Sequence, residues 1–559
     1  MAASTSQKVP DGHRRLPGSE RKPGASARLI RAADDTAKLS ATIVLRRRPD
    51  GPSIPDTAHY AATAPSQRSR LSHDDFAKRY GADDADIAKV EAFAQSYGLT
   101  VVDVNAARRT VVVTGTVAQF NEAFGVSLNY YEHKVARGRL QEEHTETYRG
   151  RDGSIHVPAD LVDVIVAVLG LDDRRITKRN AGDPPGTGRM TIPDMTRLYQ
   201  FPTNPATGQT IAILSEAGYL PSDISANFAG HPPVITDVAV GASNDNTPDS
   251  ETTQDIFIAA SAAPGAEIAV YFTSYTQQGW FDLISRVVHP GSGDPTCSVL
   301  SSSFYVTNGD DEATLAAEGV STSWLTAVTQ AFQDAAIQGV TICIASGDSG
   351  ADSKVGDGKA HVQYPASDPW VLSVGGTTVG DVNGASFEEY AWNDEFSFGG
   401  SPVVKGATGG GVSAYFDPPS YQAGADVPPS LADGRHGRGV PDVSANASPN
   451  SGYPMILGGA PSDWPANGTS SSAPLWAGLI AVLNSALQHN VGFINPTLYQ
   501  LGTNVFRDIV AQPGAADNSL NGVTGYPVRP GWDACTGWGS PNGTALLQAL
   551  RGAGDGAAG

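Results

Sequence analysis

The feature that most constrains the fold is a repeated alternation of short apolar runs with longer stretches of helical spacing, from about residue 210 onward. Runs that are apolar on both faces are typical of parallel strands covered by helices on both sides. The sequence therefore predicts an α/β domain built on a parallel sheet, with its sites at the carboxyl ends of the strands. The predicted strands are 210–214, 267–272, 299–304, 340–345 and 371–374, and the predicted helices include 250–263, 279–288 and 313–338.

A different pattern precedes this region. Residues 38–170 combine short strands with helices: Ser72 is a good helix cap, and a further helix is predicted over 117–124. This mixture indicates a compact α+β domain. Residues 1–37 are rich in Pro, Gly, Ser, Lys and Arg, and we expect a disordered tail. Residues 171–190 lack apolar periodicity, and we expect an exposed, cleavable linker that leads to a second domain over 191–559.

Charge divides the chain near the same place. Residues 1–185 hold 27 Lys and Arg against 24 Asp and Glu, whereas residues 186–559 hold 11 against 34. The acidic part would repel nucleic acid and anionic membranes, so neither is an expected partner. An excess of carboxylates is tolerable where many of them are protonated, which favours acidic working conditions.

The sequence argues against a membrane protein, a cysteine-based metal site and a disulfide-stabilised scaffold. No stretch holds the roughly 18 uncharged apolar residues that a membrane-spanning helix needs. The N-terminal residues are polar and Arg-rich, without the apolar segment of a signal peptide. The cysteines show no CxxC spacing and are odd in number, namely Cys297, Cys343 and Cys535.

One serine stands in a setting suited to nucleophilic catalysis. In the run Asn467-Gly468-Thr469-Ser470-Ser471-Ser472-Ala473-Pro474, a glycine turn is followed by an apolar stretch that predicts a buried helix opening at Pro474. Ser470 is then expected just before a helix N-terminus, where free amides favour negative charge. A serine that forms a tetrahedral oxyanion needs this environment. A serine-rich helix cap is the alternative.

Two carboxylates, Glu251 and Asp255, are spaced to share one face of the predicted helix. Like charges at this spacing are mildly destabilising, so the pair requires a reason. One interpretation is a solvated face near a helix N-terminus capped by Ser250. The other is a pair that shares a proton and leaves one carboxylate ionised as a base at low pH.

Asp348 lies in Ser346-Gly347-Asp348-Ser349-Gly350, directly after a predicted buried strand. An Asx-turn is one interpretation. The motif also resembles those of aspartic and chymotrypsin-like proteases. However, the chain has no second Asp-Thr/Ser-Gly, and its α/β pattern does not suit a β-barrel. None of the five histidines after the linker (His231, His289, His361, His436 and His489) lies in the Gly-rich turn-to-helix setting that subtilisin-like enzymes use for their base.

Together these motifs resemble the sedolisins, the serine-carboxyl peptidases, and most closely their kumamolisin branch. Gly409–Ser413 and the segment 530–537 add to the similarity, and residues 38–170 resemble the family's activation propeptide. The resemblance implies a subtilisin-like catalytic domain preceded by a ferredoxin-like antiparallel prodomain. It also implies a secreted, monomeric acid endopeptidase that acts on proteins and peptides and is inhibited by its own propeptide until self-cleavage in the linker.

The resemblance further implies a role for each matching residue. Ser470 would be the nucleophile, Glu251 its general base and acid, Asp255 the orienting carboxylate and Asp348 the oxyanion partner. A glutamate suits acid because its ordinary pKa is about 4.3, whereas a histidine base would be protonated there. Asp348 would stabilise an oxyanion only as a neutral acid.

A calcium site is implied near the C-terminus. Its ligands would be the carboxylates of Asp508 and Asp533 and the backbone carbonyls of Ile509, Arg529 and Gly531, an oxygen-rich set of the kind that Ca²⁺ requires. Turn aspartates without a metal are the alternative. Arg529, Ser215 and Phe304 depart from the branch's usual Gly, Glu and Trp. Two other functions remain open, a Ser-His-Asp hydrolase and an inactive binding homologue.

Overall fold

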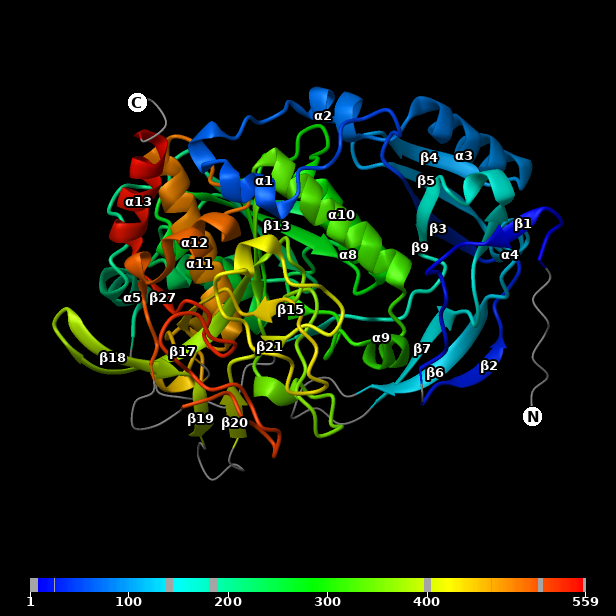
Figure 1. The fold of residues 1–559 in the computed structure, drawn as a ribbon. Coiled ribbons are helices and arrows are strands. Elements are labelled where there is room, and N and C mark those ends of the chain that lie inside the picture. Colours follow the sequence, from blue (N-terminus) through cyan, green and yellow to red (C-terminus); the bar gives the residue numbers. More distant parts are fainter. Residues whose placement is uncertain are drawn as a thin grey trace.

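The computed structural model describes residues 9–24, 26–135, 144–179, 190–396, 404–463, 465–510 and 516–555. It contains two domains in contact: an N-terminal domain, called the prodomain after the resemblance above and lying mostly on the right in Figure 1, and a larger domain, called the catalytic domain on the same ground. Among the described residues, no helix combines the length and apolar character needed to cross a membrane.

The catalytic domain is built on a sheet with the strand order β12-β13-β11-β14-β16-β17-β18, and β23 pairs with β17. Its pairs are parallel except β17 with β18. The strands are β11 (Thr210–Ser215), β12 (Ile235–Val240), β13 (Glu267–Thr273), β14 (Val299–Ser302), β16 (Thr341–Ala345), β17 (Leu372–Asn383), β18 (Ser386–Ala391) and β23 (Val443–Asn446).

Helices cover both faces of this sheet, which confirms the predicted α/β class. On β11, Ile211 and Ile213 pack with α7 (Ser250–Ala262) and α11 (Thr469–Leu487). Ala212 and Leu214 pack on the opposite face with α8 (Gln277–Val288) and α10 (Thr322–Gln338). Successive strand side chains point to opposite faces, so a strand buried on both sides must be apolar throughout.

Several boundaries differ from the sequence expectations. The helix expected over 313–338 is two helices, α9 (Glu312–Glu318) and α10, because Gly319 adopts a left-handed conformation with φ 72° and ends α9. The strand expected over 299–304 divides into β14 and β15 (Phe304–Tyr305). Strands β12, β18 and β23 were not among the strands predicted from the sequence.

The remaining elements of the catalytic domain are short or peripheral. They are α5 (Ile192–Leu198), α6 (Pro221–Asn227), α12 (Asn495–Leu501), α13 (Gly543–Asp555), β19 (Asn393–Phe396), β20 (Val404–Ala407), β21 (Gly411–Val412), β22 (Gly439–Val440), β24 (Ile456–Leu457), β25 (Ala460–Pro461), β26 (Phe506–Arg507) and β27 (Ser540–Pro541).

The prodomain has the expected ferredoxin-like antiparallel sheet, with the order β4-β5-β3-β9. Its core packs α3 and α4 against one face of the sheet, while Val44, Ala167 and Leu169 pack against α8 and α10 of the catalytic domain. Its elements are β1 (His13–Arg15), β2 (Arg28–Ala32), β3 (Lys38–Leu45), α1 (Thr57–Ala62), α2 (His73–Tyr80), α3 (Asp84–Ser96), β4 (Thr100–Asn105), β5 (Thr110–Thr116), α4 (Val117–Phe124), β6 (Asn129–Val135), β7 (His144–Gly150), β8 (His156–Pro158) and β9 (Ile165–Leu169).

Two expectations about the ends of the prodomain are corrected. The tail predicted to be disordered over 1–37 is ordered where it is described, because β1 pairs with β8, β2 pairs with β6, and Leu16 is buried. Residues 1–8 and 25 lie outside the described residues. The first part of the linker is not exposed, since Leu171 and Ile176 are buried in apolar clusters. The rest of the linker, 180–189, lies outside the described residues.

A buried ion cluster joins the two domains. Arg109 of the prodomain donates from Nη1 to Asp334 Oδ2 of α10, and Arg47 Nη2 donates to Asp334 Oδ1 at 2.8 Å. Asp334 is buried, and these two cations hold the pKa of its carboxyl well below the ordinary range. The cluster therefore stays charged in acid, and the loss of one cation would leave a buried carboxylate incompletely paired.

We expect Arg109→Ala to lower the free energy of unfolding of the full chain by about 3 kcal/mol, because a buried charge loses its partner. Denaturant unfolding measures this loss. The exposed pair Arg28–Glu132 provides the control, since Arg28→Ala should cost under about 1 kcal/mol. Adding Asp334→Asn to Arg109→Ala should recover part of the loss, and an unchanged loss in the double variant would contradict this account.

Candidate active site

Ser470 lies inside a helix rather than before one. Helix α11 begins at Thr469 and is capped by Gly468, so Ser470 is in the first turn, where backbone N–H groups have no helical acceptor. Ser470 is buried, and the described residues provide no hydrogen bond to its Oγ. Pro474 does not open the helix as expected but lies within it.

The position of Pro474 frees the backbone carbonyl of Ser470. Proline has no N–H, so the helical hydrogen bond from residue 474 to the carbonyl of residue 470 cannot form. Ser303 Oγ lies 3.3 Å from this carbonyl oxygen and also donates to Asp255 Oδ1 at 2.7 Å. Ser303 follows β14, at the carboxyl end of the sheet. One buried hydroxyl thus links Asp255 to the backbone of Ser470.

The carboxylate pair is buried on α7, so the interpretation of a solvated face is wrong. Glu251 is 5% exposed and Asp255 0%. Burial raises the pKa of Asp255 well above its ordinary value, the charge of Glu251 adds to this effect, and the Ser303 hydrogen bond opposes it. The helix is capped by Asp249, whose Oδ1 accepts the Thr252 N–H at 3.0 Å, and not by Ser250.

Helix α7 also holds the turn that precedes Ser470. The Gln254 amide donates to the Asn467 carbonyl at 3.0 Å and accepts the Asn467 N–H at 3.1 Å. Further along, α7 and α11 approach so closely that a Cβ at Gly478 would lie 2.6 Å from Ala262 Cβ. The carboxylate helix and the serine helix are therefore fixed relative to one another by two contacts that the sequence analysis did not anticipate.

Asp348 is bound to the serine helix, so a local Asx-turn does not account for its carboxylate. Its Oδ1 accepts the Thr469 N–H at 2.8 Å and the Thr469 hydroxyl at 2.7 Å. Its Oδ2 lies against Gly468, where a Cβ would be only 2.4 Å away. Gly468 has φ 78°, which also favours glycine. Asp348, Ser303 and Ser470 thus converge at the carboxyl ends of β14 and β16, the position at which α/β sheets hold their sites.

No histidine joins this constellation. His361 is paired with Asp311 and Asp357, away from Ser470. His289 instead lies at the domain interface, 3.8 Å from Asp334. The structure therefore gives no support to a Ser-His-Asp arrangement.

The five residues expected to bind calcium lie together. Asp508 Oδ2 accepts the Gly531 N–H at 2.8 Å, and Asp533 Oδ2 accepts the Arg529 N–H at 3.1 Å. Asp508 Oδ1 is buried and has no hydrogen-bond partner among the described residues. Arg529 donates its guanidinium to the carbonyls of Trp532 and Asp426. The described residues hold no cluster of three or more His, Cys, Asp or Glu, so a metal here would depend on backbone carbonyls as well.

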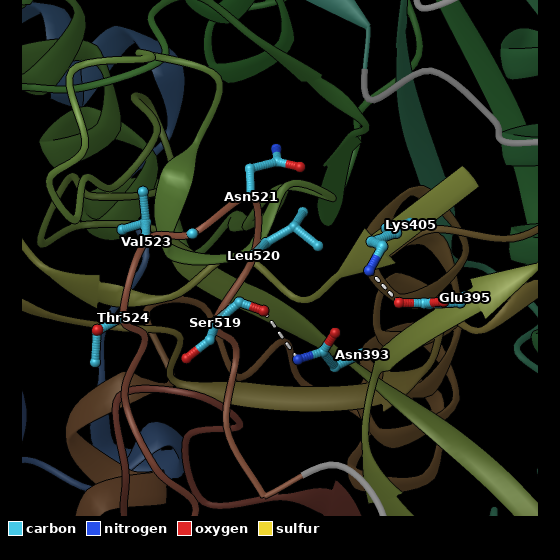
Figure 2. Close-up of a pocket in the computed structure, with 9 residues that line it drawn as sticks. Asn393, Glu395, Lys405, Ser519, Leu520, Asn521, Val523 and Thr524 are labelled. Carbon is cyan, nitrogen blue, oxygen red and sulfur yellow. Dashed lines mark hydrogen bonds and ion pairs between the residues drawn. The ribbon is translucent and has the colours of Figure 1, made fainter. Parts of the chain in front are cut away.

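A separate pocket of about 350 Å³ lies between the β19–β20 hairpin and a C-terminal loop, and none of the predicted site residues lines it. Figure 2 shows Lys405 paired with Glu395 on the hairpin side and the loop from Ser519 to Thr524 opposite. Its connection to the site is indirect, because Ala407 of β20 donates its N–H to the Asp348 carbonyl at 3.3 Å.

Comparisons with known proteins agree with this geometry. Residues 25–174 match the family described as "Pro-kumamolisin, activation domain". The chain is 38% identical over 538 residues to kumamolisin of Bacillus sp. (strain MN-32), covering 92% of each protein. It is 31% identical to tripeptidyl-peptidase sed5 of Aspergillus fumigatus, covering 96% of this chain and 97% of that one. The chain belongs to the sedolisin family.

The solved structure of Pseudomonas sedolisin, a serine-carboxyl proteinase, shares the fold of this sedolisin. It superposes with a TM-score of 0.54 at 26% identity, covering 67% of this chain and 100% of the other. The present protein is thus a serine-carboxyl peptidase of sedolisin type, made as a kumamolisin-like proenzyme.

Three residues that contact the predicted site were not predicted from the sequence: Gln254, Ser303 and Thr469. Gln254 had a detectable signal, since it lies three residues after Glu251 and so shares its helical face. Ser303 and Thr469 lacked one, because their partners are distant in the sequence: Asp255 and Ser470 lie 48 and 167 residues from Ser303, and Asp348 lies 121 residues from Thr469.

We expect Gly468→Ala to lower kcat/KM for peptide hydrolysis by about 100-fold or more, because its Cβ would displace the Asp348 carboxylate. Gly459→Ala is the matched control: Gly459 has φ 80° but nothing within 4 Å of its Cβ position. Both substitutions place an alanine at a positive φ and strain the backbone, but only the Cβ at residue 468 would contact an active-site residue, Asp348. Equal losses of activity in the two variants would contradict the proposed displacement.

Proposed function

We propose that this sedolisin is an acid-active endopeptidase in which Ser470 is the nucleophile. The observation that carries the proposal is the buried link from Asp255 through Ser303 to the backbone of Ser470, with Asp348 bound to the same helical turn. The link supports a serine whose proton is handled by carboxylates.

In this proposal Glu251 accepts the Ser470 proton as general base and returns it to the leaving amine as general acid. Ser470 Oγ makes no hydrogen bond with the described residues of the proenzyme, and catalytic hydrogen bonds often tighten only when substrate binds. Asp255, whose pKa is raised by burial and by Glu251, shares a proton with Glu251 and orients it.

Asp348 would act as a neutral acid in the oxyanion hole, together with the Ser470 N–H in the first turn of α11. Its Oδ1 already accepts two hydrogen bonds from Thr469. Because Oδ1 serves as an acceptor, the proton would be carried by Oδ2, and Oδ2 would donate it to a developing oxyanion. An ionised Asp348 would repel that charge, so activity requires acid.

The prodomain would inhibit the enzyme until acid triggers self-cleavage between 171 and 190. His289 supports this proposal: burial at the interface lowers its pKa below the ordinary value of about 6.5, so the docked state disfavours protonation. Docking should then weaken as pH falls below that value. Asp282 is half-buried and accepts the Thr42 hydroxyl; desolvation raises its pKa to about 7, so it acts in the opposite direction, because its protonation strengthens docking.

The mature protein should cleave a denatured protein substrate with a kcat/KM that is highest below about pH 5 and collapses toward neutrality, because Glu251 and Asp348 must hold different protonation states. Ser470→Ala should lower activity at least about 10⁴-fold and should prevent self-processing. Ser471→Ala, in the same turn, is the control and should keep activity.

Two outcomes would refute this proposal. A kcat/KM that peaks at about pH 7–8 would exclude carboxylate catalysis at ordinary carboxyl pKa values. A Ser470→Ala precursor that still matures to the same size without added protease would exclude self-processing. Failure of the wild-type protein to cleave at any pH would favour an inactive binding homologue.

We also propose that Asp508, Asp533 and the carbonyls of Ile509, Arg529 and Gly531 hold one structural Ca²⁺. The residues fit, because the buried Asp508 Oδ1 lacks a partner among the described residues and a hard cation would satisfy it. The Arg529 guanidinium is occupied by carbonyls, so it leaves the ligand set accessible.

The enzyme is further proposed to be secreted and monomeric, as an acid peptidase with an inhibited precursor requires separation from cell proteins.

Removal of calcium by a chelator should lower Tm, since a ligand that binds only the folded state stabilises it by about 2.7 kcal/mol at 100 times its Kd. Scanning calorimetry with and without Ca²⁺ measures the shift. Asp508→Asn should abolish it, while the nearby Asp517→Asn should keep it. A wild-type Tm that is the same in chelator and in Ca²⁺ would exclude the site.

A further inference from the structure

The described end of the linker lies on the catalytic domain as an added strand. Strand β10 (Lys178–Arg179) pairs antiparallel with β15, with Lys178 opposite Tyr305 and Arg179 opposite Phe304. The side chain of Thr177, just before it, accepts a hydrogen bond from Trp280 Nε1 at 2.8 Å. Edge strands bind extended peptides in this way, through backbone hydrogen bonds with side-chain pockets for selectivity.

The direction of this strand leads to the active site. From Lys178 to Arg179 the chain passes from Tyr305 to Phe304, toward Ser303, whose hydroxyl contacts the Ser470 carbonyl. A peptide that continued in the same register would bring the second residue after the lysine position opposite Ser303. The lysine position would then be the third residue before the scissile bond.

The Lys178 side chain is held by Glu318 at the end of α9. Lys178 Nζ lies 2.7 Å from Glu318 Oε1, and the two side chains are 36% and 18% exposed. Lys178 Nζ also lies 6.0 Å from the centre of the Tyr305 ring. Glu318 Oε2 is buried and has no hydrogen-bond partner among the described residues, so this carboxylate can accept a further donor.

We propose that Glu318 is a specificity-determining residue that binds a cationic side chain of peptide substrates, at the third residue before the scissile bond. Removal of the linker exposes β15 and Glu318, and a substrate strand takes the place of β10. Arginine is bound more tightly than lysine, because its fork of donors reaches both carboxylate oxygens. This inference rests on the proposed function only in needing a mature, active peptidase.

Glu318 also lies apart from Gln363, which is a buried polar side chain close to Asp348. A Cβ at Gly347 would be 2.6 Å from Gln363 Oε1. Glu318 lies at the end of α9 and pairs with Lys178, which is opposite Tyr305. The cation is therefore bound at a position other than the one beside Asp348.

The test uses the mature enzyme and a peptide series that differs only at the third residue before the scissile bond, with Arg, Lys, Gln or Glu there. We expect kcat/KM for Lys to exceed that for Gln by about tenfold, as one charge-assisted hydrogen bond provides, with Arg higher still. Glu318→Gln should remove the preference while kcat/KM for the Gln peptide stays unchanged. Glu318→Lys should reverse it in favour of Glu.

Glu312→Gln is the matched control, since Glu312 is an exposed glutamate on the same helix and should leave the Arg and Lys preference intact. Equal kcat/KM for the Lys and Gln peptides in the wild-type enzyme would overturn the inference, and so would a preference that survives Glu318→Gln. Failure of the proposed function is distinct: either no peptide of the series is cleaved at any pH, or all are cleaved best at about pH 7–8, and neither result depends on the side chain at this position.

Discussion

The missing N–H of Pro474 is the constraint on which the arrangement of the active site depends. In an ordinary helix the Ser470 carbonyl would accept that N–H and would be closed to other groups. Here it is open, and Ser303 reaches it from the end of β14 while also binding Asp255. Helix α11, the end of β14 and the Asp255 carboxylate are therefore linked through one hydroxyl, that of Ser303.

Burial of two carboxyl groups one helical turn apart is unfavourable, and the surrounding core must offset it. Helices α7 and α11 achieve this by packing closely along their small residues, with Ala262 against Gly478 and an apolar cluster extending to β11. The same close packing keeps the pair buried and contributes to the raised pKa of Asp255. Stability and chemistry are thus coupled through one helix–helix contact.

Sequence patterns predicted the elements whose signal is local and failed where order comes from distant partners. The helix Val117–Phe124 was found because its cap and spacing lie within it, and the doubly buried strands were found from their apolar runs. The prediction of a disordered tail was wrong because β2 is ordered by its pairing with β6, about a hundred residues away. The four predicted site residues were found because each lies in a recognisable sequence motif. The roles of Ser303 and Thr469 depend on hydroxyl contacts that only the fold creates.

The prodomain contacts combine two kinds of electrostatics that respond differently to acid. Asp334 remains ionised because Arg47 and Arg109 hold its pKa low, so this ion cluster keeps its strength as pH falls. His289 lies beside the same cluster, and burial lowers its pKa while Asp334 opposes this effect, so the docked state disfavours its charged form. The ion cluster thus fixes how the prodomain docks, whereas His289 and Asp282 would give that docking opposite dependences on pH.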